Sequence, residues 1–99
     1  MRPIPQVSVQ HSDGQSIFTV AREYAIKADK VQLIYSRDNA YTFDRVQMKR
    51  RLDGCYSVRL EGDTTNLVYF VEVRWPGPIY LTSIPEMPEG FVPRIRPPS

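Results

Sequence analysis

The chain has 99 residues, of which 41% are hydrophobic and 24% are charged, and this composition is typical of one ordinary globular domain. Thirteen Lys and Arg residues against eleven Asp and Glu residues give a net charge of +2, too balanced to indicate nucleic acid or an anionic membrane by itself. These values exclude a large multidomain enzyme for this stretch of chain. No run approaches the roughly 20 apolar residues of a membrane-spanning helix, so we expect no membrane contact.

The prolines separate two regions of the chain. None of the nine lies between Gln6 and Trp75, and proline lacks the amide donor that a sheet requires. We therefore predict a β-sandwich domain over residues 6–84 and a proline-rich, extended C-terminal arm over residues 85–99. The arm is either a mobile end or a segment that packs on its own domain or on a neighbour. Four apolar residues of the arm favour packing, namely Met87, Phe91, Val92 and Ile95.

Between the proline-rich ends, apolar and polar residues alternate with a period of two, which is the pattern of half-buried strands. The alternation predicts strands at residues 7–10, 17–21, 31–35, 41–50, 55–60, 67–75 and 79–84. Residues 21–29 have helical composition, but they are too few for an independent helix and are predicted as a strand end plus a connection. About seven short strands with frequent turns predict an all-β, antiparallel, immunoglobulin-like β-sandwich, and an open barrel is the alternative.

The register of one hairpin can be predicted from its sequence. A three-residue loop at residues 52–54 places Met48 opposite Val58 and Val46 opposite Leu60, so that one face is apolar and the other polar. A two-residue loop would mix charged and core side chains on the same face. We therefore predict the three-residue loop, with Gly54 in the left-handed region of backbone conformation.

Four segments of this pattern resemble a known superfamily: Val31 to Tyr35, Phe43 with Val46 to Met48, Asp53 to Leu60, and Val68 to Val73. Their order is similar to that of immunoglobulin-like sandwiches of the fibronectin type III and early-set kind, which include glycogen-binding-like modules. The resemblance covers residues 30–75 and implies a shared fold rather than a shared function. Starch-binding members usually present two tryptophans on an aromatic platform, whereas Trp75 is the sole tryptophan here.

No catalytic or metal-binding constellation is found in the sequence. Cys55 is the only cysteine, so neither an intrachain disulfide nor a multi-cysteine metal site can form. His11 is the only histidine and lies in a predicted turn, where histidine is usually solvated. Cys55 lies near Arg51, which can lower the pKa of a thiol, but an inert thiol is the simpler interpretation. We predict no enzyme activity and no cofactor, and the lack of an apolar leader predicts a cytoplasmic protein or an excised part of a larger one.

The predicted register gathers cations on the outer face of the hairpin, namely Arg45, Lys49, Arg51 and Arg59. They could bind phosphate, an acidic protein surface, an anionic sugar or nucleic acid, or they could prevent edge-to-edge aggregation of exposed strands. Tyr56 is predicted to turn inward, which removes the stacking platform of a single-strand-binding protein. Nucleic acid is therefore the less favoured partner.

A second candidate site is the segment from Trp75 to Tyr80, in which prolines flank Gly77 and stiffen the turn. Such an aromatic pair suits sugar stacking or a peptide contact, and it also suits closing the end of a sandwich core. We predict a non-catalytic binding or assembly module that acts through protein–protein contacts or self-association. The alternative is a glucan-binding module with Trp75, Tyr80 and Tyr41 as its stacking surface.

Overall fold

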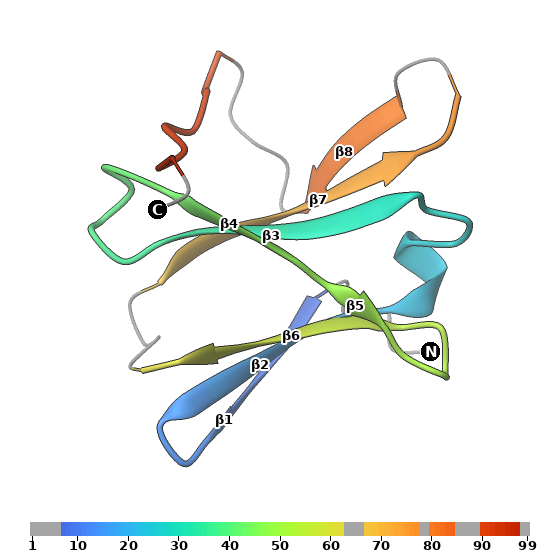
Figure 1. The fold of residues 1–99 in the computed structure, drawn as a ribbon, viewed down its shortest axis with the longest axis horizontal. Coiled ribbons are helices and arrows are strands. Elements are labelled where there is room, and N and C mark those ends of the chain that lie inside the picture. The colour runs from blue at the N-terminus through green and yellow to red at the C-terminus, as the bar shows by residue number, and fades with distance from the viewer. Residues whose placement is uncertain (1–6, 63–66, 78–79, 85–89, 98–99) are drawn as a thin grey trace, which may run out of the picture.

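The structure of the chain, a computed structural model, describes residues 7–62, 67–77, 80–84 and 90–97, with the backbone alone for 80–84. Two antiparallel sheets stack on one another (Figure 1). One sheet contains, in spatial order, β1 (Val7–Ser12), β2 (Gln15–Val20), β6 (Tyr56–Glu61) and β5 (Lys49–Arg50). The other contains β4 (Asp44–Gln47), β3 (Lys30–Ser36), β7 (Val68–Trp75) and β8 (Tyr80–Ile84). The predicted all-β antiparallel sandwich is therefore confirmed.

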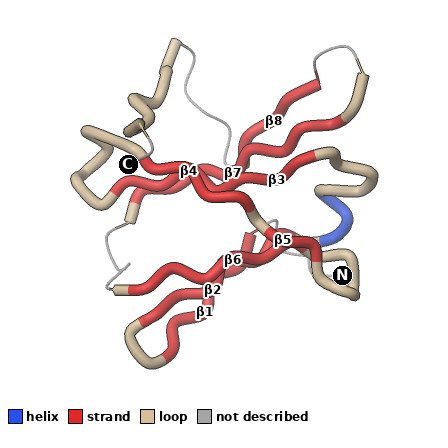
Figure 2. Tube along the Cα trace, in the orientation of Figure 1, coloured by secondary structure: helices blue, strands red, loops and turns tan. Residues whose placement is uncertain are grey.

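The connection between the sheets is short and has little regular structure. Only a 3-10 turn at Arg22–Tyr24 is helical within the described residues, and it leads from β2 into β3 (Figure 2). Three successive backbone turns follow one another there, with Tyr24, Ala25 and Ala28 each donating to the carbonyl three residues earlier. The prediction of a connection without an independent helix agrees with this geometry.

The main core lies between the sheets and follows from the alternation of side chains. In β2, Phe18 and Val20 are buried while Ile17 and Thr19 face outward, because successive residues of a strand point to opposite faces. Burial of each large apolar side chain stabilises the fold by roughly 1.5–3 kcal/mol. The buried members of this core are Phe18, Val20, Ala25, Val31, Leu33, Met48, Leu60, Val71 and Val73.

One strand crosses from sheet to sheet at Met48. Its first part, β4, pairs with β3, and its second part, β5, pairs with β6 (Figure 1). Met48 is buried at the crossing, and its backbone N–H donates to the carbonyl of Val31 at 2.9 Å. The predicted strand over residues 41–50 is therefore two segments, and the prediction that Val46 faces Leu60 is wrong. Val46 pairs with Leu33 in the other sheet, where it also packs against the main core.

The hairpin beyond Met48 has the predicted register. Lys49 pairs with Ser57 and Arg50 with Tyr56, which leaves residues 52–54 as a three-residue loop. Gly54 has a φ of +89°, a conformation that glycine adopts without the steric cost of a side chain. Tyr56 is half-buried and packs against the main core, so its predicted inward orientation is also confirmed.

A second, smaller core lies on the outer face of the β4-β3-β7-β8 sheet, under the C-terminal arm. Ile34, Phe43 and Phe70 are buried there, and Phe91 and Ile95 of the arm pack against them. The ring centroid of Phe91 lies 6.0 Å from that of Phe43 and 5.8 Å from that of Phe70. Residues 90–97 therefore pack on their own domain, as one of the two alternatives for the arm predicts.

The arm is also hydrogen-bonded to the start of β4. The N–H of Phe43 donates to the carbonyl of Arg94 at 2.8 Å, and the N–H of Arg96 donates to the carbonyl of Phe43 at 2.7 Å. These bonds form an isolated parallel bridge between Phe43 and Ile95. The arm therefore makes a single parallel β-bridge at the residue that precedes β4.

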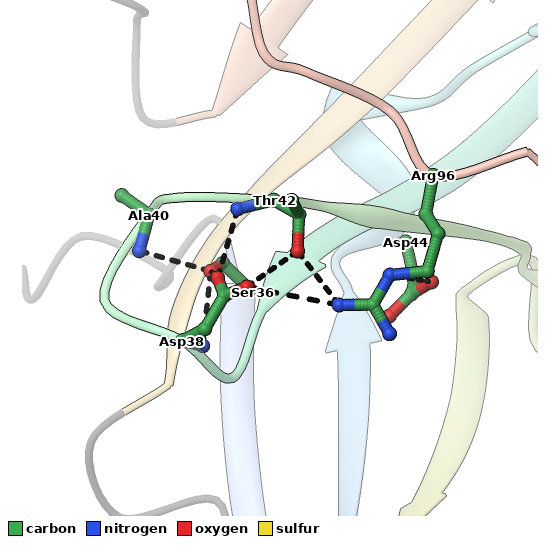
Figure 3. A network of polar contacts seen from close by, with 6 residues as sticks. All are labelled: Ser36, Asp38, Ala40, Thr42, Asp44 and Arg96. Carbon is green, nitrogen blue, oxygen red and sulfur yellow. Dashed lines mark hydrogen bonds and ion pairs between the residues drawn. The ribbon is translucent and has the colours of Figure 1, made fainter.

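A polar network joins Arg96 of the arm to the β3–β4 loop (Figure 3). The Asp38 carboxylate accepts hydrogen bonds from Ser36 Oγ, from the Thr42 N–H and from Thr42 Oγ1, at 2.7, 2.8 and 2.5 Å. Arg96 donates to Thr42 Oγ1 at 2.6 Å and lies 3.7 Å from Asp38. The bonds from Thr42 and Ser36, together with the charge of Arg96, hold the pKa of Asp38 far below its usual range.

Candidate functional site

An open groove crosses the outer face of the β1-β2-β6-β5 sheet. Its volume is about 780 Å³. The sheet supplies most of its walls, since Ile17 pairs with Arg59 and Thr19 with Ser57 on the outward face of β2 and β6. The lining residues are Gln10, Ile17, Thr19, Val46, Gln47, Lys49, Arg51, Ser57, Val58 and Arg59.

The groove is positively charged along the side of the hairpin. Lys49, Arg51 and Arg59 all line it, and none of its described lining residues carries a carboxylate. No ion pair joins Lys49 or Arg59 to another described residue. Arg51 lies 3.7 Å from the carboxylate of Asp53, and an ion pair exposed to water in this way contributes little to stability. Three positive charges on one concave surface attract anionic groups.

The hairpin loop that carries these cations has its own hydrogen bonds. Asp53 accepts from the Cys55 N–H at 3.0 Å, and Arg51 donates its backbone N–H to the Cys55 carbonyl at 2.7 Å. The bond from Cys55, with the nearby charge of Arg51, lowers the pKa of Asp53 below its ordinary value. These hydrogen bonds give the loop a defined conformation beside Arg51, which lines the groove.

Arg45 does not belong to the groove, which corrects the prediction that four cations share one face. It pairs with Ile34 in the β4-β3-β7-β8 sheet and is exposed there. The reason is the crossing at Met48, which places residues before it and residues after it in different sheets. Three of the four predicted basic residues, Lys49, Arg51 and Arg59, are thus brought together.

Two of the aromatic candidates, Trp75 and Tyr41, do not share a surface. Trp75 ends β7 beside Lys30, whereas Tyr41 follows the opposite end of β3, so the length of a seven-residue strand, about 20 Å, separates them. Trp75 is half-buried against the main core, and its indole N–H donates to the Ile26 carbonyl at 2.8 Å. Tyr80 pairs with Trp75 between β7 and β8, but its side chain lies outside the described part.

Tyr41 is an exposed aromatic residue on the β3–β4 loop. Its side chain is 70% exposed, and the guanidinium carbon of Arg94 lies 5.6 Å from its ring centroid. A cation above an exposed ring contributes roughly 0.5–1 kcal/mol. Tyr41 thus contacts the C-terminal arm instead of joining Trp75.

The residues considered for catalysis are also apart. His11 and Ser16 share a hydrogen bond of 2.7 Å between Nδ1 and Oγ across the β1–β2 hairpin. Cys55 is a half-buried free thiol in the β5–β6 hairpin. Among the described residues, no group of three potential metal ligands is found. No helix in that part of the chain is long and apolar enough to cross a bilayer.

A second, smaller pocket escaped the sequence analysis. It has a volume of about 280 Å³ and lies between the β2–β3 connection and the β5–β6 hairpin. Arg22 and Lys27 come from the connection and Arg50 from the hairpin. The signal available in the sequence was the cluster of cations around residue 50, but nothing in it shows that the connection folds over the hairpin.

The sandwich thus belongs to the all-β class, and comparison with known proteins bears on its fold. No family model matches the chain, and no curated protein matches its sequence. The chain is similar to part of an apo pullulanase from Paenibacillus barengoltzii, with a TM-score of 0.61 and 13% identity over 82% of this chain. The same values hold for that pullulanase in complex with maltohexaose and alpha-cyclodextrin. A mutant complexed with maltotriose gives a TM-score of 0.61 and 14% identity over 77% of this chain.

The matched segment is a small part of the pullulanase. It covers 12% of that chain in each of these structures. At such low identity the similarity establishes a shared fold and nothing about activity.

Proposed function

We propose that the chain is a non-catalytic binding module of immunoglobulin-like fold that holds an acidic segment of a partner protein in its groove. The strand order supports the finer fold assignment. The β1-β2-β6-β5 and β4-β3-β7-β8 sheets have the connectivity expected when A-B-E-D and C′-C-F-G sheets pack together. Such sandwiches carry binding surfaces on an otherwise inert framework.

One observation carries the proposal: three cations line a concave surface that contains no described carboxylate. Ile17 lies on the same outward face, opposite Arg59, and offers an apolar contact between charged positions. An extended acidic peptide with apolar residues matches that pattern, because its carboxylates would meet guanidinium groups and an apolar side chain would meet Ile17.

Binding of a labelled acidic peptide, measured by fluorescence anisotropy, tests this function. Arg59→Gln and Lys49→Gln should each weaken binding several-fold, and higher salt should weaken it further. Arg45→Gln is the matched control, since it removes the same charge from the other sheet. Equal losses in Arg59→Gln and Arg45→Gln would show that only net charge matters, and the groove would be rejected as the site.

Glucan binding is the second candidate, favoured by the similarity in fold to a segment of pullulanase. The groove also offers neutral polar side chains to sugar hydroxyls, namely Gln10, Thr19, Gln47 and Ser57. Retardation in an amylose-containing gel tests it, with Gln47→Ala expected to reduce the retardation. Added salt should leave sugar binding unchanged, whereas it should weaken binding of an acidic peptide. Absence of any retardation would eliminate this candidate.

A further inference from the structure

The smaller pocket lies on the opposite side of the β5–β6 hairpin from the groove. Lys49 and Ser57 form one cross-strand pair and line the groove, whereas the next pair, Arg50 and Tyr56, lines the pocket. Successive residues of a strand point to opposite faces, so the two sites are separated by the hairpin backbone. No residue lines both sites.

Two elements supply the cations of the pocket, the β2–β3 connection and the β5–β6 hairpin. The stem of Arg22 lies against Gly54, because a Cβ atom at Gly54 would come within 2.7 Å of Arg22 Cδ. The absence of a side chain at Gly54 thus admits Arg22 to the hairpin loop. The backbone of Arg50 pairs with that of Tyr56 across the hairpin, and the Cβ atoms of such pairs lie about 5 Å apart.

The third cation, Lys27, lines the pocket from a backbone conformation that lysine seldom adopts. Its φ is +60°, and the side chain of a residue in this region costs about 1–2 kcal/mol relative to the right-handed form. The fold tolerates that cost at a position that lines the same pocket as two other cations. Strain of this kind is often found where a site requires a particular placement.

The pocket has an unbalanced charge. Arg22, Lys27 and Arg50 line it, and its other lining residues are Ala25, Ile26, Ala28, Gly54 and Tyr56, none of them acidic. No ion pair joins any of the three cations to another described residue. Like charges around one concavity repel one another, and a bound anion removes that repulsion.

We propose that this pocket binds a phosphate group, either as inorganic phosphate or as a small phosphate monoester. The two N–H groups on one side of a guanidinium group match the spacing of two phosphate oxygens. Arg22 and Arg50 can therefore each donate two hydrogen bonds to a phosphate. Tyr56 also lines the pocket, and its side chain carries a hydroxyl group that can donate a hydrogen bond. A volume of about 280 Å³ lies at the lower end of ligand pockets and suits one tetrahedral anion with a small substituent.

Titration of the whole chain with inorganic phosphate, followed by two-dimensional amide NMR at constant ionic strength, tests the site. We expect saturable shifts of the Gly54 and Lys27 amide signals. Arg50→Gln should weaken binding at least about tenfold, since the loss of even one charge-assisted hydrogen bond has that effect. Arg45→Gln is the matched control, because it removes an arginine from the other sheet, outside both the pocket and the groove, and should leave phosphate affinity unchanged.

A second variant separates loss of binding from loss of folding. Lys27→Gly removes a cation at a position where φ is positive, so it should preserve the folded spectrum while weakening phosphate binding. A parallel titration with glycerol 3-phosphate distinguishes the ligand sources: tighter binding than phosphate indicates a monoester, and equal or weaker binding indicates the free ion. Non-saturating shifts, or equal losses in Arg50→Gln and Arg45→Gln, would overturn the site and leave the groove proposal standing.

Discussion

Ala40 illustrates how single residues in the β3–β4 loop carry conformational cost. Its φ is +70°, and its neighbour Asn39 has a φ of +61°. Asparagine tolerates this region, whereas the Cβ of alanine crowds the backbone there. The Ala40 N–H still donates to Ser36 Oγ at 2.9 Å, so the loop conformation satisfies a hydrogen bond at the expense of local strain.

Replacing Ala40 by glycine should therefore stabilise the protein. Relief of the positive φ outweighs the added flexibility of the unfolded chain, and we expect a gain of about 0.5–1 kcal/mol in the free energy of unfolding. Ala21→Gly is the control, since Ala21 has a φ of −62° and the same exchange there should cost about 0.5–1 kcal/mol. Urea denaturation of both variants measures the difference, and a loss of stability in Ala40→Gly would contradict the interpretation.

Asp38 should make the stability of the loop depend on pH in the acid range. Its pKa in the folded state lies below that of the unfolded chain, which is about 3.9, mainly because Thr42 and Ser36 donate hydrogen bonds to the carboxylate. The stabilisation is therefore complete above about pH 5, and it is lost as the pH falls below about 4 through the folded-state pKa.

Carboxyl NMR titration of Asp38, together with unfolding measurements between about pH 2 and pH 7, checks this expectation. Thr42→Val removes the hydroxyl donor and keeps the backbone N–H, so the pKa of Asp38 should rise toward its ordinary value. In Asp38→Asn the contribution of this carboxylate to the acid dependence should disappear. An Asp38 titration at an ordinary pKa in the unaltered protein would refute the network as described.

At the scale of elements, the arm is the segment whose contribution is easiest to isolate. Phe91 packs on the second core, whereas the next residue, Val92, is 84% exposed. Phe91→Ala should lower the free energy of unfolding by about 1–3 kcal/mol, less than for a fully buried ring. Val92→Ala should change it by less than about 0.5 kcal/mol. Thermal and urea unfolding measure both, and equal effects of the two variants would show that the arm does not pack.

The hairpin and the crossing strand show how far sequence reasoning reaches. The register of the β5–β6 hairpin was predictable, because only one loop length separates apolar from charged side chains. The crossing at Met48 was not, because Val46 and Met48 remain buried in alternation whichever sheet supplies their partners. Alternation states which side of a strand is buried, and it does not state which neighbour the strand pairs with.

The candidate sites show the same limit. Lys49, Arg51 and Arg59 were predictable because they follow from the hairpin register. The pocket around Arg22 was not, because its walls come from segments about 25 residues apart that meet only after folding. The apolar residues of the arm indicated that it packs, but nothing local indicated that Phe91 would cover the outer face of β3 and β7.

At the scale of the whole molecule, two cores of unequal size predict unequal stability. The main core joins both sheets, whereas the second core joins one sheet to the arm. Local opening of the arm would expose the second core alone and leave the main core of the sandwich intact. The Phe43 and Arg96 amides, which bond β4 to the arm, should therefore exchange with solvent faster than those of Leu33 and Val71 in the central strands.

Native-state hydrogen exchange measures this, and we expect a difference of at least about tenfold. Phe91→Ala should accelerate exchange at Arg96 and leave Leu33 nearly unchanged. Identical opening free energies at all four amides would mean that the arm and the sandwich unfold as one cooperative unit.

The crossing at Met48 has a consequence for how copies of this chain could polymerise. The outer strand on that flank belongs to one sheet before Met48 and to the other after it, and the arm lies beside its beginning. A straight strand from another copy cannot pair along this edge, because its free backbone N–H and C=O groups pass from one sheet to the other. Templated fibril growth from the folded state is therefore left to the opposite flank, where β1 and β8 end their sheets.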